Sequence, residues 1–144
     1  MKKEKFENTL YSNVAQLYHR NRSFMDEELR KRGITDLGFS HVRIVIILYI
    51  YGKLSMKEIT EKIAKDKSTV TILVNKLEKK EYVKKKSCET DKRVVYLELG
   101  DKAEEILDIL FDVSQIFQKK VEETLDEGER ETFIKIMAKL IRNW

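Results

Sequence analysis

The sequence predicts a mainly helical fold that carries one small β-hairpin. The chain of 144 residues contains no proline and only five glycines, so little opposes long helices. Apolar residues recur at helical spacing through most of the chain, and two β-branched runs flank a polar loop near residue 90. Because this length suits one hydrophobic core, we expect residues 1–144 to form a single domain.

The first fifty residues predict two helices. Apolar side chains recur at steps of three, four and seven from Phe6 onward, and Gly33 suits the end of that helix. A second helix is expected from a cap at Ser40 to Tyr51, where Gly52 ends it. This helix is apolar on nearly every side, so it should lie in the middle of the domain.

A helix-turn-helix and a hairpin are expected next. Ser55 and Glu58 have the spacing of a capping box, and after a short helix and a turn a further helix covers residues 67–80. Residues 82–86 and 94–99 have the composition of paired strands. A hairpin directly after a helix-turn-helix is a wing, so residues 40–99 predict a winged helix-turn-helix.

The C-terminal part predicts two more helices. The first spans about 101–125 with apolar residues on two sides, and Asp126 with Glu129 can cap the second. Two apolar sides exceed what a small domain can cover, which favours a homodimer over a larger monomeric core. Residues 1–33 and 101–144 are therefore the expected dimerisation helices. The expected interface residues are Phe6, Leu10, Ile116, Phe117, Phe133, Met137, Leu140 and Ile141.

The charge of the chain is unevenly distributed. Between Lys62 and Arg93 there are eleven Lys or Arg against five Asp or Glu, whereas the whole chain has a net charge of +4. This segment suits polyanion binding, although a solvated lysine-rich face would have the same composition. The single cysteine, Cys88, suits a reducing compartment. No apolar leader is present and the longest apolar run, 44–51, is too short to span a membrane, so we expect a cytoplasmic protein without membrane contact.

The helix over residues 67–80 is expected to present a polar face to solvent. Its apolar side faces the core, and the opposite side carries small hydroxyls, an amide and a lysine. Such side chains can reach base edges and phosphates in a major groove. An outward isoleucine among them suits a thymine methyl group, although isolated apolar residues are common on surfaces. The residues expected on this face are Ser68, Thr69, Thr71, Ile72, Asn75 and Lys76.

The loop of the expected hairpin contains Asp91, Lys92 and Arg93. An arginine at the end of a hairpin can enter a narrow minor groove, where the potential is most negative. A carboxylate two residues earlier could hold that arginine in place. The alternative interpretation is a turn-favouring aspartate with solvated basic neighbours.

Residues 55–99 resemble the MarR (multiple antibiotic resistance regulator) family of winged-helix transcription factors. The hydroxyl-rich segment 67–71, segment 73–78, Tyr82-Val83 and above all Asp91-Lys92-Arg93 carry the resemblance. It implies a homodimeric regulator that binds a pseudo-palindromic operator in double-stranded DNA. Repression is the expected mode of regulation, with activation left open, and no cofactor is expected. The same resemblance implies that the polar helix face described above reads the major groove. Arg93, oriented by Asp91, would enter the minor groove.

The resemblance also implies a small-molecule effector. Members often release DNA when a small, frequently aromatic, molecule binds between the dimerisation and DNA-binding regions. Three positions depart from the family pattern: Ile72 replaces a frequent arginine, Ala64 stands near a usual glycine, and Gly100-Asp101 replaces a threonine cap. The first of these affects the expected operator sequence. Candidate effector contacts, most of them more simply core or interface residues, are Tyr11, Tyr18, His19, His41, Arg43, Tyr49 and Tyr51.

Other classes of protein have weaker support from the sequence. A metal sensor needs clustered ligands, but Cys88, His19 and His41 are scattered, so no metal site is expected. A redox sensor would use Cys88, whose pKa the cations at 84–86 and Arg93 could lower. No phosphate loop, nucleophile elbow or paired-histidine motif indicates an enzyme. A winged helix used for protein contact is the remaining alternative, which a steep salt dependence of DNA binding would exclude.

Overall fold

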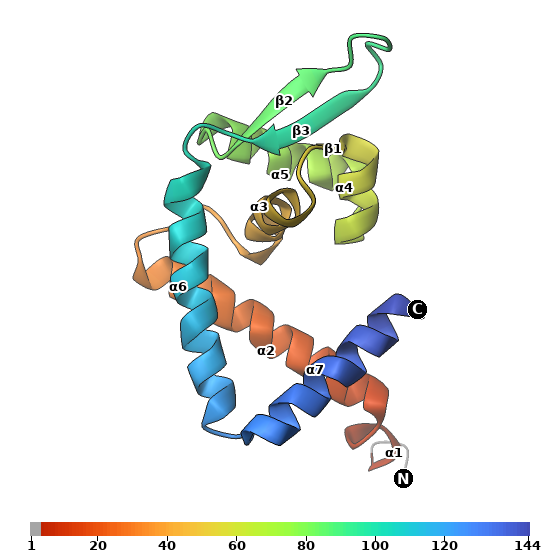
Figure 1. The fold of residues 1–144 in the computed structure, drawn as a ribbon, viewed down its shortest axis with the longest axis vertical. Coiled ribbons are helices and arrows are strands. Elements are labelled where there is room, and N and C mark those ends of the chain that lie inside the picture. The colour runs from red at the N-terminus through yellow and green to blue at the C-terminus, as the bar shows by residue number, and fades with distance from the viewer. Residues whose placement is uncertain (1–3) are drawn as a thin grey trace. The chain divides into compact units, whose positions relative to one another are not determined.

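The computed structural model of the protein describes residues 4–144 and confirms the mainly helical fold with a small hairpin. The chain divides into two compact units, residues 1–107 and 108–144. Within residues 4–144, no helix is both long enough and apolar enough to cross a membrane. The first unit contains, in chain order (Figure 1), α1 (Glu4–Glu7), α2 (Leu10–Lys31), α3 (Phe39–Tyr51), β1 (Leu54–Ser55), α4 (Met56–Ile63), α5 (Lys67–Lys79), β2 (Val83–Ser87), β3 (Val95–Leu99) and the start of α6 (Ala103–Glu122).

Helix α3 forms the centre of the first unit, as its composition predicts. It packs against α2, α4, α5 and β3, and Val42, Ile44 and Val45 are completely buried. Full burial of an aliphatic side chain of this size contributes about 1.5–3 kcal/mol. Residues 49–51 at the end of α3 are exposed, so the helix is not covered along its whole length.

The start of α3 differs from the prediction, and the expected cap at Ser40 is wrong. The N-cap residue is Gly38, whose amide donates to Nδ1 of His41 at 3.1 Å. The Phe39 amide donates to Oδ1 of Asp26 in α2 at 2.7 Å. Because this second acceptor comes from another helix, no local motif announces it.

The hairpin belongs to a three-stranded antiparallel sheet of order β1-β3-β2. Strand β1 has two residues and pairs Leu54 with Leu97, which the sequence pattern did not predict because so short a strand shows no alternation. The β2–β3 pairing runs from Val83 opposite Leu99 to Ser87 opposite Val95. The hairpin itself is therefore confirmed, with each strand beginning one residue later than expected.

Gly100 is required by close backbone packing at the end of the sheet. Its amide donates to the Tyr82 carbonyl at 2.9 Å. A Cβ atom at this position would overlap the Glu81 carbonyl oxygen. A side chain there would force the two backbone segments apart. Gly100 therefore allows the close packing of the sheet end in addition to leading the chain into α6.

The second unit contains the rest of α6 and helix α7 (Glu127–Arg142). The predicted capping box is confirmed: Asp126 Oδ1 accepts from the Glu129 amide at 2.9 Å, and Glu129 Oε2 accepts from the Asp126 amide at 3.1 Å. Arg130 Nη1 donates to Oε1 of Glu122 at 2.7 Å and links α7 to α6. None of the sixteen residues of α7, all of which are described, is buried.

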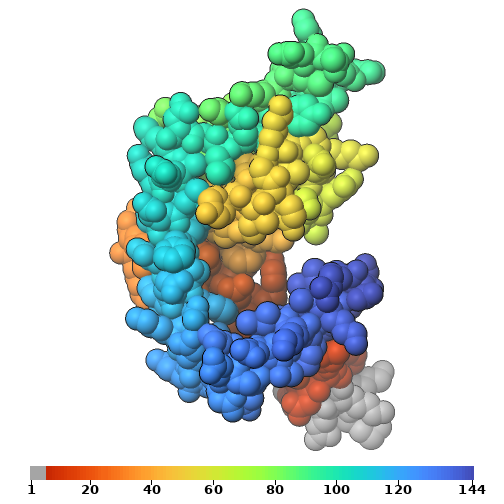
Figure 2. All heavy atoms as spheres, in the orientation of Figure 1, coloured from red at the N-terminus to blue at the C-terminus, as the bar shows by residue number. Residues whose placement is uncertain are grey.

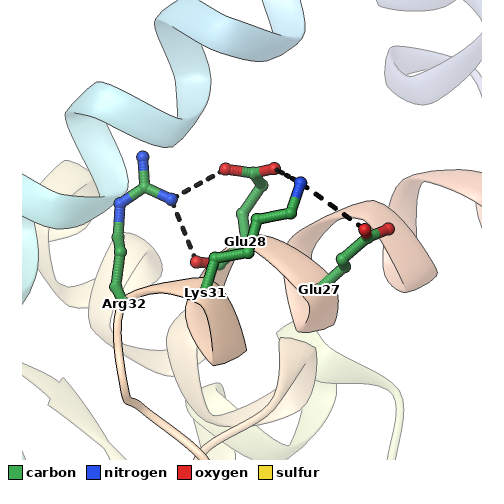
Figure 3. Close-up of polar contacts among 4 residues, drawn as sticks. All are labelled: Glu27, Glu28, Lys31 and Arg32. Carbon is green, nitrogen blue, oxygen red and sulfur yellow. Dashed lines mark hydrogen bonds and ion pairs between the residues drawn. The ribbon is translucent and has the colours of Figure 1, made fainter.

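A buried carboxylate holds the C-terminal turn of α2 (Figure 3). Glu28 is only 6% exposed, and its Oε2 accepts from Nη1 of Arg32 at 2.7 Å while its Oε1 accepts from Nζ of Lys31 at 2.8 Å. Arg32 Nη1 also donates to the Glu28 carbonyl at 2.9 Å. The bonds from Lys31 and Arg32 lower the pKa of Glu28, since both cations favour the ionised form.

We expect Glu28→Gln to lower the free energy of unfolding at pH 7 by about 1–3 kcal/mol, because it removes a charged partner from a buried network. A carboxylate with a lowered pKa stabilises the fold above its usual value of 4.5, and that contribution disappears as the pH falls below it. The difference between wild type and variant should therefore shrink at pH 3 in urea unfolding. Glu27→Gln is the control, because Glu27 is exposed; an equal loss in both variants would contradict the role of Glu28.

Candidate nucleic-acid interface

The helix-turn-helix is formed by α4, a short turn and α5. The predicted capping box of α4 is confirmed, since the Glu58 amide donates to Ser55 Oγ at 3.2 Å and the Ser55 amide donates to Glu58 Oε2 at 2.7 Å. In the turn, Ala64 has a left-handed backbone with φ of 52°. This residue redirects the chain between the helices, at the place where the resemblance led us to expect glycine.

We expect Ala64→Gly to raise the free energy of unfolding by about 0.5–1 kcal/mol, because the left-handed conformation strains any residue with a Cβ atom. Thermal or urea unfolding measures the change. Ala15→Gly, at an exposed position inside α2, should lower the stability by a similar amount. A loss of stability in both variants would mean that the turn carries no such strain.

Asp66 caps α5 and holds the hydroxyl groups of its first turn. Its carboxylate accepts from the Ser68 hydroxyl at 2.5 Å, from the Thr69 hydroxyl at 2.6 Å and from the Thr69 amide at 2.9 Å. These bonds, the one from Ser68 foremost, hold the pKa of Asp66 well below its usual range. The Thr71 hydroxyl donates to the Lys67 carbonyl at 2.9 Å. All three hydroxyl protons are thus engaged, and the hydroxyls offer lone pairs to other molecules.

Helix α5 has one buried and one exposed side, as the sequence predicts. The residues facing the core are Val70, Leu73, Val74 and Leu77. On the other side Ser68, Ile72 and Asn75 are exposed, while Thr69, Thr71 and Lys76 are half-buried. Ile72 is 69% exposed, so it contributes an apolar contact surface instead of core packing. The start of this face is slightly hollowed, and the depression is lined by Asp66, Lys67, Ser68, Thr71 and Ile72.

The loop of the hairpin presents an arginine held by a carboxylate. Arg93 Nε donates to Asp91 Oδ1 at 3.0 Å and Nη2 donates to Oδ2 at 3.1 Å, so the predicted pairing is confirmed. The bonds from Arg93 lower the pKa of Asp91 and those to Asp91 raise the pKa of Arg93. The Arg93 side chain is nevertheless 90% exposed. In Figure 2 the hairpin, in green, extends beyond the rest of its unit, so the loop is accessible to a partner.

Part of the basic segment is paired with acidic side chains. Lys84 and Lys86 both bind Glu98 of β3, at 3.7 and 2.8 Å. Lys85 binds Glu78 of α5 at 3.1 Å. Lys85 was not predictable as a functional residue, because its partners Asn75 and Glu78 lie on another element and no spacing rule connects them. Fewer cations of this segment, residues 62–93, are therefore unpaired than its composition suggests.

Cys88 lies in the hairpin but not in the environment that the sequence suggested. Its pKa is lowered mainly by a hydrogen bond with the Thr90 hydroxyl, 3.2 Å from Sγ, and also by the backbone of Asp91 and Thr90, while the charge of the Asp91 carboxylate raises it. The expected effect of the neighbouring cations is therefore wrong, because those side chains bind carboxylates elsewhere. Among the residues that the structure describes, no group of three or more His, Cys, Asp or Glu could hold a metal ion.

Comparisons with known proteins find helix-turn-helix transcriptional regulators and one matching family model. The family model described as "MarR family" matches residues 40–95, from α3 into β3. The chain is 24% identical to the HTH-type regulator YwhA of Bacillus subtilis over 97% of this chain and 99% of YwhA. It is 31% identical to the regulator SarZ of Staphylococcus epidermidis, over 57% of each chain. The Streptococcus pneumoniae FabT structure, solved with DNA, superposes with a TM-score of 0.74 at 19% identity, over 92% of this chain and 93% of FabT. The winged helix-turn-helix of the chain therefore matches the MarR family.

The match to the MarR family model covers the elements that carry the candidate interface. Residues 40–95 include α4, α5, the hairpin loop and both members of the Asp91–Arg93 pair. The two curated relatives named above are HTH-type transcriptional regulators. The chain is therefore a winged helix-turn-helix transcriptional regulator, and the expectation of a regulator rather than an enzyme agrees with these relatives.

Proposed function

We propose that this chain is a cytoplasmic transcriptional repressor that binds a pseudo-palindromic operator in double-stranded DNA as a homodimer. One observation carries the proposal: the polar face of α5 and the exposed Arg93 loop belong to one compact unit, which can present both to a single duplex. The FabT structure, which shares the fold, is a complex with DNA and supports DNA as the ligand.

In this proposal α5 enters the major groove, which is wide enough to admit a helix. The residues placed against the bases and phosphates are Ser68, Thr69, Thr71, Ile72, Asn75 and Lys76. The three hydroxyls, whose protons are donated to Asp66 and to the Lys67 carbonyl, match base edges that donate, namely cytosine N4 or adenine N6. Ile72 matches a thymine methyl group.

The hairpin loop is placed in the adjacent minor groove. Arg93 extends into solvent while Asp91 restricts its orientation, so little side-chain entropy remains to be lost on insertion. A narrow A·T-rich groove has the most negative potential and is the matching site for this guanidinium. Lys92, exposed in the same loop, lies close enough in sequence to approach a phosphate.

The homodimer is supported by apolar side chains that the chain itself leaves exposed. Ile141 is 77% exposed, Leu10 is 73% exposed and no residue of α7 is buried. Burying such surface against a second copy is favourable, and a two-fold axis explains a palindromic operator. The proposed interface consists of Phe6, Leu10, Ile116, Phe117, Phe133, Met137, Leu140 and Ile141.

The test is a fluorescence titration of the purified protein against the intergenic DNA upstream of its own gene, at two salt concentrations, with scrambled duplex as competitor. We expect selective binding of two chains per site, with the logarithm of the affinity falling linearly with that of the salt concentration. Binding without selectivity at either salt would contradict the proposal and favour a winged helix used for protein contact. Release by a small aromatic effector stays a prediction, which adding candidate molecules to the same titration checks.

A further inference from the structure

Strand β2 carries a lysine, Lys85, on the face of the sheet that packs against the core. Lys85 pairs with Leu97 of β3, which is completely buried. Cross-strand partners point to the same face of a sheet, so the Lys85 side chain leaves β2 on the face that packs against the core. Strand β2 also packs against α5. The neighbours Lys84 and Lys86 alternate to the other face, where both bind Glu98.

The Lys85 ammonium binds two side chains of α5. Its Nζ donates to Asn75 Oδ1 at 2.6 Å and lies 3.1 Å from Glu78 Oε2. An ammonium group has donors and no acceptor, so the Asn75 amide must turn its oxygen toward Lys85. Hydrogen bonds from a charged donor are shorter and stronger than neutral ones, which holds the amide in this orientation. The two N–H donors of Nδ2 are left on the side away from Lys85, on a residue that is exposed.

We propose that Lys85 is a specificity-determining residue, which holds the amide oxygen of Asn75 and so makes Asn75 read a base edge through its donors. The inference rests on the proposed function, with α5 in the major groove. A free asparagine reads adenine, because it donates to N7 and accepts from N6 at the same time. Held this way, Asn75 turns its oxygen toward Lys85 and presents its two donors outward, and guanine, whose N7 and O6 are both acceptors, is the base that matches them.

The experiment selects bound duplexes from a pool of randomised operators with the full-length protein and sequences them. The position read by Asn75 is defined as the one whose base preference disappears in Asn75→Ala. At that position we expect wild type to select guanine over adenine. Lys85→Met keeps the length of the side chain and frees Oδ1, so it should shift the guanine-to-adenine ratio toward adenine by about tenfold.

Two variants separate this role from charge and from folding. Lys86→Met removes the same charge from the same strand but leaves the Asn75–Lys85 bond intact, so it should keep the guanine preference. Asn75→Asp keeps an acceptor for Lys85 and removes both donors, so it should lose that preference. Circular dichroism confirms that each variant is folded before the selection.

The outcomes distinguish the inference from the function on which it rests. A wild-type protein that selects no sequence would overturn the proposed function and the inference together. Three outcomes with a clear operator would overturn the inference alone. They are unchanged base preferences in Asn75→Ala, a wild-type preference for adenine, and the same guanine preference in Lys85→Met. Adenine gained only in Lys85→Met would support it.

Discussion

The double variant Leu140→Asp/Ile141→Asp should be monomeric and should lose at least about 100-fold in affinity for the operator. Both side chains belong to the proposed interface, and they are 46% and 77% exposed in the single chain. Two carboxylates at an apolar contact would have to be desolvated without partners, which opposes dimer formation. Two linked half-site contacts gain about 10²–10⁴ in affinity over one, and a monomer forfeits this gain.

Sedimentation analysis and the salt-controlled titration measure these two effects. Lys135→Asp is the control, because Lys135 is exposed, is not a residue of the proposed interface and lies about 120° around α7 from Ile141. Its charge change is larger than that of either single substitution. It should leave both the oligomeric state and the operator affinity close to those of wild type. A double variant that stays dimeric would remove the end of α7 from the interface.

Arg93→Ala should weaken operator binding by about 1–3 kcal/mol, the usual contribution of a well-placed base contact. The folded state should be unaffected, because the Arg93 side chain is 90% exposed and its partner Asp91 is a neighbour in the same loop. The titration that tests the proposed function measures this loss directly. The loss should be largest on operators with A·T pairs at the position of the hairpin, where the minor groove is narrow.

Lys92→Ala is the matched control for this prediction, since it removes the same charge from the next residue of the loop. It should cause a smaller loss that does not depend on the base sequence, as expected for a phosphate contact. Equal losses of affinity in the two variants would mean that Arg93 contributes only its positive charge and reads no base. An unchanged affinity in Arg93→Ala would exclude the hairpin from the mechanism.

Features that depend on spacing within one element were predictable from the sequence. The capping boxes at Ser55 and at Asp126 join residues three apart, and the Asp91–Arg93 pair joins residues two apart. The buried side of α5 follows from helical periodicity alone. In each case the partners are fixed by the geometry of a helix or a turn, so the same local sequence produces the same contact.

Contacts between elements were not predictable in the same way. Phe39 is capped by Asp26 from α2, and Gly100 is required because the Glu81 carbonyl lies where its side chain would be. Lys85 looks like one of three equivalent lysines in the sequence, and only the register against Leu97 turns it toward Asn75.

The sequence by itself therefore determined the helices, the capping boxes at Ser55 and Asp126, the hairpin and the candidate side chains for binding DNA. The tertiary structure decided which of these side chains are already engaged, and hence which hydrogen-bonding groups remain to read a base. The physical reason is that periodicity and capping act within a few residues, whereas the direction of a donor depends on how a strand and a helix distant in sequence pack together.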